Sequence, residues 1–310
     1  MLRKVLDRNY FACAKTYKRA IAGCMVAIAL GGYGCTGSVQ TNNFKSFTDW
    51  CLHKAKLSPD AKYTVDLLLV QAGTNDCNQA NVQLSNLTTL YLNGNTIGRP
   101  GRVKSLINLD SHGFSGKRIS DIRPLKYFTN LTKLDLGANE ISDISPLKSL
   151  TNLSELNLAA NQIFDIKPLQ SLTNLTNLEL SGNKISNISS LQFLTNLTVL
   201  SLSSNQISDI IPLKSLKGIT LLILDDNKIS DITPLKSLPK LTKLGLGRNK
   251  ISDISPLKNL TNLIFVTLDS NQISNISSLK FMPNLVFIGL QANPIDNKSC
   301  PVNRQTACTF

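Results

Sequence analysis

One spacing constrains this 310-residue chain more than any other feature: an isoleucine recurs every 22 residues, and in nine of ten cases an asparagine stands two positions before it. The isoleucines occupy positions 97, 119, 141, 163, 185, 207, 229, 251, 273 and 295. Self-similarity at a fixed period of about 20 to 50 residues indicates a repeat architecture, in which stacked units share one core. The chain is therefore expected to fold as a solenoid of ten units over residues 87–295.

Each unit has the pattern of a short strand followed by a return segment. In one clean unit, Leu134 and Leu136 alternate with other residues, which predicts a strand with one buried face. Pro146 stops that strand from continuing, and Leu147 and Leu150 have the spacing of a 3-10 or helical turn. The recurring asparagine carries two donors and an acceptor, which can satisfy buried backbone groups of adjacent units.

These patterns resemble a known family. The phrase Leu-x-x-Leu-x-Leu-x-x-Asn-x-Ile of residues 131–141 resembles the leucine-rich-repeat signature, and the tail Ser-Asp-Ile-x-Pro-Leu-x-x-Leu-Thr-Asn of 142–152 resembles the 22-residue class of bacterial internalins. Residues 87–298 carry this resemblance. It implies an α/β repeat solenoid: a curved array with a parallel sheet on its concave face, 3-10 or helical return segments and a small helical N-terminal cap. It also implies a binding scaffold.

The regions that flank the repeats are expected to cap the open ends of the array. Residues 44–86 are expected to form the helical N-terminal cap, with one helix that begins at Ser58-Pro59 and ends at Gly73. Residues 296–310 are expected to close the other end. Both flanks resemble those of cyanobacterial leucine-rich-repeat proteins.

Four cysteines follow the leader, two in each flank, and they allow three disulfide connectivities. The local pairs Cys51–Cys77 and Cys300–Cys308 are favoured, because an elongated array keeps its two ends apart. Disulfides indicate an oxidising compartment.

The N-terminal segment, residues 1–35, has the composition of an export signal. Residues 1–19 carry six basic residues and one acidic residue, and residues 20–34 are uncharged, mostly apolar and short for a membrane span. Without residues 1–34, the net charge of +13 falls to about +8. Cys35 is a candidate for lipidation and membrane anchoring, while ordinary cleavage after Ser38 and an uncleaved anchor are the alternatives. Residues 36–43 are expected to form a tether, and the protein is expected in the periplasm, at the cell surface or secreted.

Candidate binding residues lie between the buried strand leucines, where period-two alternation directs side chains out of the concave face. Most of these positions are small and polar, but the C-terminal units carry large apolar residues there, and such clusters rimmed by charge mark interaction sites. The candidate partner-binding set is Val199, Leu221, Ile223, Asp225, Asp226, Lys243, Arg248, Phe265, Asp269, Phe287 and Gln291. The competing interpretation is that Phe287 packs beneath the C-terminal cap and Leu221 is ordinary surface.

A column of lysines recurs outside the strands, and it either binds an anionic surface or is a solvated face that blocks lateral aggregation. Its members are Lys104, Lys126, Lys148, Lys214, Lys236, Lys258 and Lys280, with Gln170 and Gln192 in the gap. Aromatic residues are not regularly interleaved with the lysines, so a nucleic-acid partner is not expected. His112, at a leucine position, is interpreted as a core histidine rather than a titrating switch.

The motifs of common enzymes are not found, since the sequence has no nucleophile elbow, phosphate loop or Cys-x-x-Cys pair. We therefore expect a non-enzymatic, monomeric scaffold without cofactor or metal, which binds a protein or glycan through its concave face. One alternative is an envelope or matrix structural protein that places its lysine column on anionic surfaces, which strong salt dependence would favour. Another is an intracellular repeat protein resembling phosphatase-regulatory subunits, which a processed N-terminus and oxidised cysteines would exclude.

Overall fold

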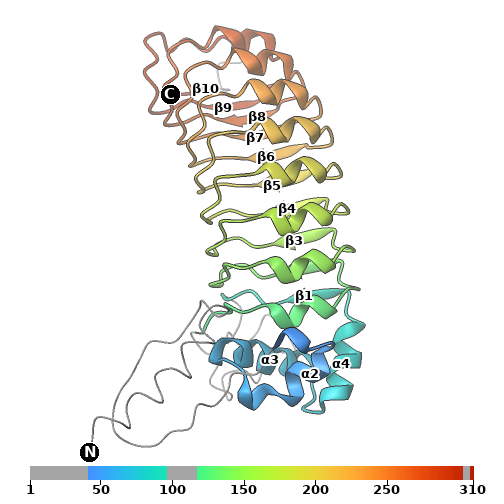
Figure 1. The fold of residues 1–310 in the computed structure, drawn as a ribbon. Helices are drawn as coiled ribbons and strands as arrows, with labels where there is room; N and C mark the ends of the chain where they lie inside the picture. The colour runs from blue at the N-terminus through green and yellow to red at the C-terminus, as the bar shows by residue number, and fades with distance from the viewer. Residues whose placement is uncertain (1–40, 96–116, 303–307) are drawn as a thin grey trace, which may run out of the picture. The chain divides into compact units, whose positions relative to one another are not determined.

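The computed structural model describes residues 41–95, 117–302 and 308–310. Within them, ten parallel strands form one sheet in chain order (Figure 1). The strands are β1 (Thr89–Tyr91), β2 (Lys133–Asp135), β3 (Glu155–Asn157), β4 (Asn177–Glu179), β5 (Val199–Ser201), β6 (Leu221–Ile223), β7 (Lys243–Gly245), β8 (Phe265–Thr267), β9 (Phe287–Gly289) and β10 (Cys308–Thr309). The predicted repeat solenoid with a parallel sheet is confirmed.

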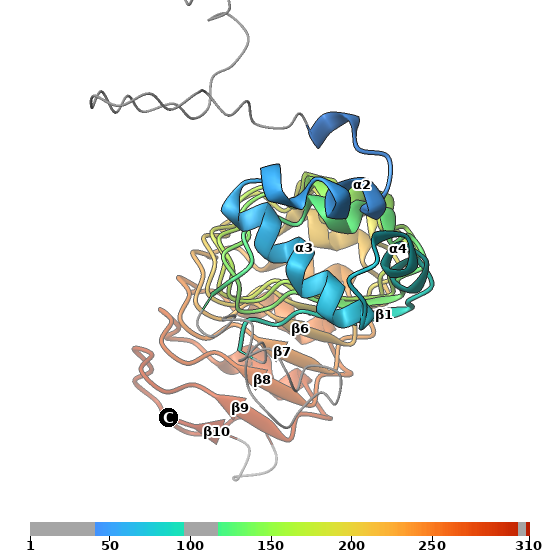
Figure 2. The same ribbon diagram turned by 90° about the horizontal axis from the view of Figure 1, so that it is seen from below.

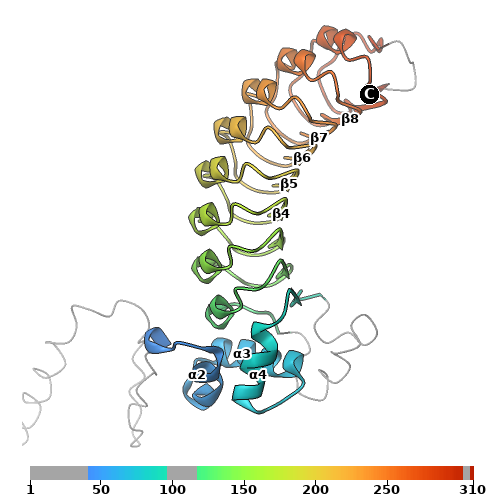
Figure 3. The same ribbon diagram turned by 90° about the vertical axis from the view of Figure 1, so that its right-hand side faces the viewer.

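Between the strands the chain returns through five-residue 3-10 turns. They are η5 (Arg123–Tyr127), η6 (Ser145–Ser149), η7 (Lys167–Ser171), η8 (Ser189–Phe193), η9 (Ile211–Ser215), η10 (Thr233–Ser237), η11 (Ser255–Asn259) and η12 (Ser277–Phe281). The strands lie on the concave side of the curved array and the turns on the opposite, outer side (Figure 3). Side chains on the strands and on the turns therefore form two separate surfaces.

The core between sheet and turns is a stack of leucine and isoleucine columns. In the third unit, Leu134, Leu136, Ile141, Ile144 and Leu147 are each at most 2% exposed, and the same positions are buried in the units that follow. Fully burying one such side chain contributes about 1.5–3 kcal/mol relative to leaving it exposed. Because each unit buries this surface against its neighbours, the units depend on one another for stability.

The asparagine column performs the role predicted for it. Asn161 Oδ1 accepts the backbone N–H of Ile141 at 2.9 Å, and its Nδ2 donates to the carbonyls of Leu136 and Leu158 at 3.0 Å. The amide thereby joins its own unit to the preceding one. Ala160, immediately before it, has a left-handed backbone with φ 53°, which turns the chain off the strand. The same arrangement recurs along the array.

The start of the sheet differs from a plain stack of ten repeats. Thr89 of β1 pairs with Lys133 of β2, which lies 44 residues later, twice the repeat length. Asn139 Nδ2 donates directly to the Leu92 carbonyl at 2.8 Å, so the first and third units are neighbours in the sheet. The strand expected between them, which includes His112, lies outside the described residues. In the sequence, His112 stands at the position that the buried Leu134 holds in β2.

Three helices cover the N-terminal end of the array (Figure 2). They are α2 (Phe47–Leu52), α3 (Pro59–Ala72) and α4 (Cys77–Ser85), accompanied by the short 3-10 helices η1 (Thr41–Asn43) and η2 (Lys54–Lys56). The predicted bounds of α3 are confirmed: Ser58 Oγ accepts the Ala61 N–H, and Gly73 ends the helix with a left-handed backbone of φ 65°. No helix within the described residues is long and apolar enough to span a bilayer.

The cap is fixed to the repeats by polar and aromatic contacts. Thr64 Oγ1 donates to the Asp121 carbonyl at 2.7 Å, and the rings of Phe47 and Phe128 lie 5.7 Å apart. Residues 41–43, the last part of the expected tether, instead form η1, where Thr41 Oγ1 accepts a hydrogen bond from Arg123 at 2.8 Å. Thr41, which lies in the segment expected to be a tether, therefore contacts the array through Arg123.

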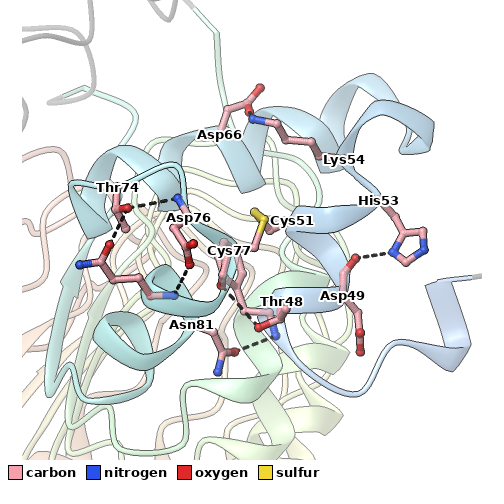
Figure 4. Close-up of a disulfide and its surroundings, with 12 residues drawn as sticks. Thr48, Asp49, Cys51, His53, Lys54, Asp66, Thr74, Asp76, Cys77 and Asn81 are labelled. Atoms are coloured by element: carbon pink, nitrogen blue, oxygen red, sulfur yellow. Dashed lines mark hydrogen bonds and ion pairs between the residues drawn. A yellow bond between two sulfur atoms is a disulfide. The ribbon is translucent and has the colours of Figure 1, made fainter.

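Each flank contains a local disulfide. Cys51 of α2 is bonded to Cys77 at the start of α4, next to a hydrogen bond from the Phe47 N–H to Asn81 Oδ1 (Figure 4). Cys300 is bonded to Cys308, which belongs to β10. The local connectivity favoured by the sequence is the one that the structure contains.

Candidate functional site

The sheet register brings the large apolar candidates on the concave face into one line. Val199 is the partner of Leu221, Leu221 of Lys243, Lys243 of Phe265, and Phe265 of Phe287. We call these five residues the concave row. Adjacent strands are about 4.8 Å apart, so the five side chains stand next to one another across β5 to β9.

The concave row combines apolar surface with a single cation. Phe265 is 43% exposed, whereas Val199, Leu221 and Phe287 are half-buried. Lys243 is exposed, and its Nζ lies 5.8 Å from the centre of the Phe265 ring, within the range of a cation–π contact. Lys243 thus lies between Leu221 and Phe265 in the row, with its ammonium near the aromatic ring. The row offers hydrophobic contact and one positive charge to a ligand.

A second row, displaced by two residues, is partly hollow. Ile223 is half-buried, while the corresponding positions in β7 and β9 are Gly245 and Gly289. Asp225 lies in the first hollow, where its Oδ1 accepts the Gly247 N–H at 2.7 Å and the Thr267 hydroxyl at 3.0 Å.

Asp269 lies in the second hollow and accepts the Gln291 N–H at 2.8 Å. Asp225 and Asp269, two of the predicted binding residues, thus accept hydrogen bonds from backbone N–H groups of the following unit, and both are half-buried.

The remaining predicted residues lie along the edge where the strands end. Asp226, Arg248 and Gln291 are exposed, and the first two have left-handed backbones with φ of 56° and 53°. Asp226 Oδ2 accepts the Ser204 hydroxyl at 2.9 Å. The charges of Asp226 and Arg248 and the amide of Gln291 are available to a ligand that extends past the concave row.

Sequence analysis missed a groove of about 290 Å³ at the N-terminal half of the same face. Its lining includes Tyr91, which is 49% exposed, together with Glu179 and Val199. Across it, Lys133 Nζ lies 2.7 Å from Glu155 Oε1, and this hydrogen bond raises the pKa of Lys133 above its ordinary value. Tyr91 could have indicated this groove in the sequence. It is the one aromatic residue at the outward strand positions before Val199, where the other residues are polar or glycine.

The lysine column lies on the outer side, as predicted, at the fourth position of the 3-10 turns. The described members are Lys126, Lys148, Lys214, Lys236, Lys258 and Lys280, and all but Lys126 are exposed. Lys104 and the lipidation candidate Cys35 lie outside the described residues. In the part of the chain that the structure describes, no group of three or more His, Cys, Asp or Glu side chains is placed to hold a metal ion.

Two family models of leucine-rich repeats match parts of the chain. The family described as Leucine Rich repeats (2 copies) matches five overlapping segments between residues 129 and 259, and the family described as Leucine Rich repeat matches residues 83–104. No curated protein sequence that was compared with the chain matches it significantly.

Solved structures of similar fold include two internalins of Listeria monocytogenes. Internalin C2 is 33% identical, with a TM-score of 0.62, over 73% of this chain and 91% of that one. Internalin F is 30% identical, with a TM-score of 0.55, over 79% of each chain. The ectodomain of the plant receptor kinase GASSHO1/SCHENGEN3 from Arabidopsis thaliana, in complex with CASPARIAN STRIP INTEGRITY FACTOR 2, is 25% identical over 56% of this chain and 23% of that one, with a TM-score of 0.51.

Proposed function

The chain belongs to the internalin-like leucine-rich-repeat proteins, and from this premise we propose that it is an exported, non-enzymatic scaffold that binds a protein ligand on its concave face. A glycan is the alternative ligand. The observation that carries the proposal is the concave row, in which Phe265 and its neighbours keep apolar surface in contact with solvent across five adjacent strands. Apolar clusters of this kind, rimmed by charge, typically form the centre of an interface.

The architecture supports binding by a preformed surface. The sheet and the asparagine column fix each strand to the next, so little conformational freedom remains to be lost when a ligand binds. The plant receptor of similar fold was solved in complex with CASPARIAN STRIP INTEGRITY FACTOR 2, which shows that a leucine-rich-repeat ectodomain can hold another molecule. Lys243 and Arg248 beside the apolar side chains favour a ligand with carboxylates around an apolar centre.

Export is proposed on two grounds. The basic and then apolar composition of residues 1–34 is that of a signal segment, and two disulfides are typical of proteins in oxidising compartments. The same disulfides count against an intracellular phosphatase-regulatory role. Anchoring through Cys35 is proposed as the attachment to the membrane.

Affinity capture tests the proposed binding face. The bait is residues 38–310, which form one compact unit, and it is offered to envelope and culture extracts and to a glycan array. A Leu221→Glu, Phe265→Glu variant is compared with Phe281→Glu, which alters a phenylalanine on the outer side that is 54% exposed, against 43% for Phe265. We expect a ligand that the wild type and Phe281→Glu retain and that the double variant loses. Equal capture by all three baits, each shown to be folded, would contradict the proposal.

A second candidate function, binding to anionic surfaces, is favoured by the exposed lysines of consecutive outer turns. Its test is co-sedimentation with vesicles rich in phosphatidylserine. The wild type is compared with a Lys236→Gln, Lys258→Gln variant, since glutamine is the residue that the array itself has at 170 and 192. Electrostatic binding of this kind weakens as salt is raised toward 0.5 M, whereas binding through the concave row changes little.

A further inference from the structure

The groove of about 290 Å³ in the first half of the concave face, which we call the N-terminal groove, is built from two rows of outward side chains. The sheet register aligns Lys133, Glu155, Asn177 and Val199 in one row, and Tyr91, Asp135, Asn157 and Glu179 in the other. Val199 is also the first residue of the concave row. The N-terminal groove therefore continues directly into the apolar surface of β5 to β9.

The two rows differ in charge. Lys133 Nζ lies 2.7 Å from Glu155 Oε1, so the charges in the first row compensate each other. Lys133 is the only cation among the described residues that line the groove, and the second row adds the carboxylates of Asp135 and Glu179. Arg118 does not line the groove and donates to the Ala138 carbonyl at the edge beyond β2. The groove is thus negative, although the chain as a whole has a net charge of +13.

The fold itself does not require a negative charge at these positions. Asp135 Oδ1 accepts the Gly137 N–H at 2.9 Å, and in the next unit Asn157 Oδ1 accepts the Ala159 N–H at the same distance. An uncharged amide therefore satisfies the same backbone donor. The hydrogen bond holds the Asp135 carboxylate in place, and its charge is available to act on a ligand.

An aromatic ring lies beside the two carboxylates. Tyr91 is 49% exposed and pairs in register with Asp135, while the same position in β2 to β9 has no aromatic residue. The face of such a ring attracts ammonium and guanidinium groups. Glu179 lies two strands beyond Asp135, about 9.6 Å away along the sheet. A cationic group above Asn157 would therefore be flanked by two carboxylates.

We propose that the N-terminal groove binds a lysine or arginine side chain of the protein ligand whose apolar part lies on the concave row. The inference rests on the proposed function, because it takes a protein on the concave face as the ligand. Attraction between this cation and the two carboxylates would determine which end of the ligand lies toward the cap. A neutral glycan is less favoured, since amides such as Asn157 and Asn177 could recognise it without the charges of Asp135 and Glu179.

Selection from a random dodecapeptide library displayed on phage tests the proposal, with residues 38–310 as the bait. Five strand spacings separate Glu155 of β3 from Phe265 of β8, which is about 24 Å and about seven residues of an extended chain. We expect the enriched peptides to carry a lysine or arginine about seven residues away from a large apolar residue.

The disrupting variant is Asp135→Asn, Glu179→Gln. It removes both charges but keeps the acceptor oxygens for the N–H groups of Gly137 and Ser181. We expect this variant to enrich no basic residue, and to bind a basic peptide selected on the wild type about three- to tenfold more weakly. Replacing the basic residue of that peptide by norleucine should weaken binding to the wild type by a similar factor and leave binding to the variant unchanged.

The matched control removes two charges from the outer side of the array. In Asp209→Asn, Asp253→Asn each new amide keeps an acceptor for the N–H two residues further on, as Asn187 does for Ser189. We expect the control to select and bind the same basic peptides as the wild type. An equal loss in the control and in the groove variant would assign the effect to the overall charge of the protein and overturn the proposal.

The other outcomes separate this inference from the proposed function. Leu221→Asn, Phe265→Asn alters the concave row without adding charge, and it should lose the apolar part of the selected pattern while keeping the basic residue. Apolar peptides without a basic residue, or no enriched peptide at all, would overturn the assignment of the groove. A neutral oligosaccharide bound through Tyr91, and lost in Tyr91→Ala, would also overturn it. Basic peptides that are indifferent to the Leu221 and Phe265 variant would instead leave the groove assigned and contradict the role of the concave row.

Discussion

The carboxylate of Asp225 fills the space above Gly245 on the neighbouring strand. A Cβ added to Gly245 would lie 2.2 Å from Asp225 Oδ2, far closer than any real contact. Two units later Asp269 stands in the same relation to Gly289, with a distance of 2.4 Å. Glycine is needed at both strand positions because a carboxylate from the preceding unit already occupies the place of a side chain.

The same pairs explain how a backbone donor is satisfied. In β2, β3 and β4 the outward strand residue accepts the N–H two residues further on, as Asp135 does for Gly137 at 2.9 Å. Gly245 has no side chain with which to do this. Asp225 of the preceding unit therefore accepts the Gly247 N–H. The donor keeps a hydrogen bond, although the acceptor comes from another unit.

We predict that Gly245→Ala destabilises the array by about 1–3 kcal/mol, because the new methyl group displaces Asp225 and leaves the Gly247 N–H unpaired. Urea unfolding followed by circular dichroism measures the change. The double variant Gly245→Ala, Asp225→Ala should cost less than the sum of the two single variants, since each removes the other's clash or contact. Strict additivity would show that the two residues do not interact.

Substituting a member of the asparagine column should be among the most harmful single changes. Asn161→Ala removes the acceptor of the buried Ile141 N–H. The carbonyls of Leu136 and Leu158 lose one donor each but keep Asn139 and Asn183, respectively. One buried unsatisfied donor costs about 1–3 kcal/mol when water cannot reach it, and we expect a loss of that size in urea unfolding. Gln162→Ala, at the exposed neighbouring position, is the matched control and should change stability by less than about 0.5 kcal/mol.

The N-terminal cap should weaken in acid through Asp49. The backbone N–H groups of Lys45 and Ser46 donate to its carboxylate and hold the pKa of Asp49 below its usual 3.8. A lowered folded-state pKa stabilises the fold above pH 3.8, and this contribution is lost as the pH falls through the lowered value. Asp49→Asn keeps an acceptor oxygen but removes the charge. We expect its melting temperature to lie below that of the wild type at pH 7, with the difference closing in strong acid; a constant difference would assign the effect to geometry.

Removing the Cys51–Cys77 disulfide should uncouple the cap from the repeats. The bond closes a loop with a sequence separation of 26, for which chain entropy predicts about 3 kcal/mol of stabilisation. Trp50, the single tryptophan, is 1% exposed and adjacent to Cys51, and the Arg123 guanidinium of η5 lies 5.3 Å from the centre of its ring, so its fluorescence reports on the cap and on the contact of the cap with the array. In Cys51→Ala, Cys77→Ala, the Trp50 transition should move to lower urea than the circular-dichroism transition of the array. Coincident transitions would mean that cap and repeats unfold as one unit.

The 22-residue period and the spacing within it were sufficient to predict the stacked units, the strands with one buried face, the turns and the asparagine contacts, because each depends on one residue type that recurs at one position. The parallel sheet was implied by the resemblance to leucine-rich repeats. The bounds of α3 were predicted from Ser58-Pro59 and Gly73 at its ends. The direct pairing of β1 with β2 could not be predicted, because isoleucine keeps its 22-residue register through the unit between them.

The site shows the same limit. Alternation predicts correctly that Leu221 and Phe265 face out of the sheet and share one line across it. It also directs Asp225 outward, but the carboxylate bends over Gly245 because the neighbouring strand leaves a hollow there. The contact between Asp225 and Gly245 involves two different repeat positions in two neighbouring units, so neither position considered alone predicts it.

The two-residue strand β10 has a consequence for how long the sheet can become. It pairs with Ile288 and Gly289 of β9, accepts the Leu290 N–H through Thr309 at 2.8 Å, and is held in place by Cys308. An uncovered last strand would present free backbone groups to another molecule, as exposed edge strands do. The Cys300–Cys308 disulfide is thus one of the contacts that keep the edge of β9 covered. Reduction of this bond would loosen β10 and favour pairing of β9 with another extended chain.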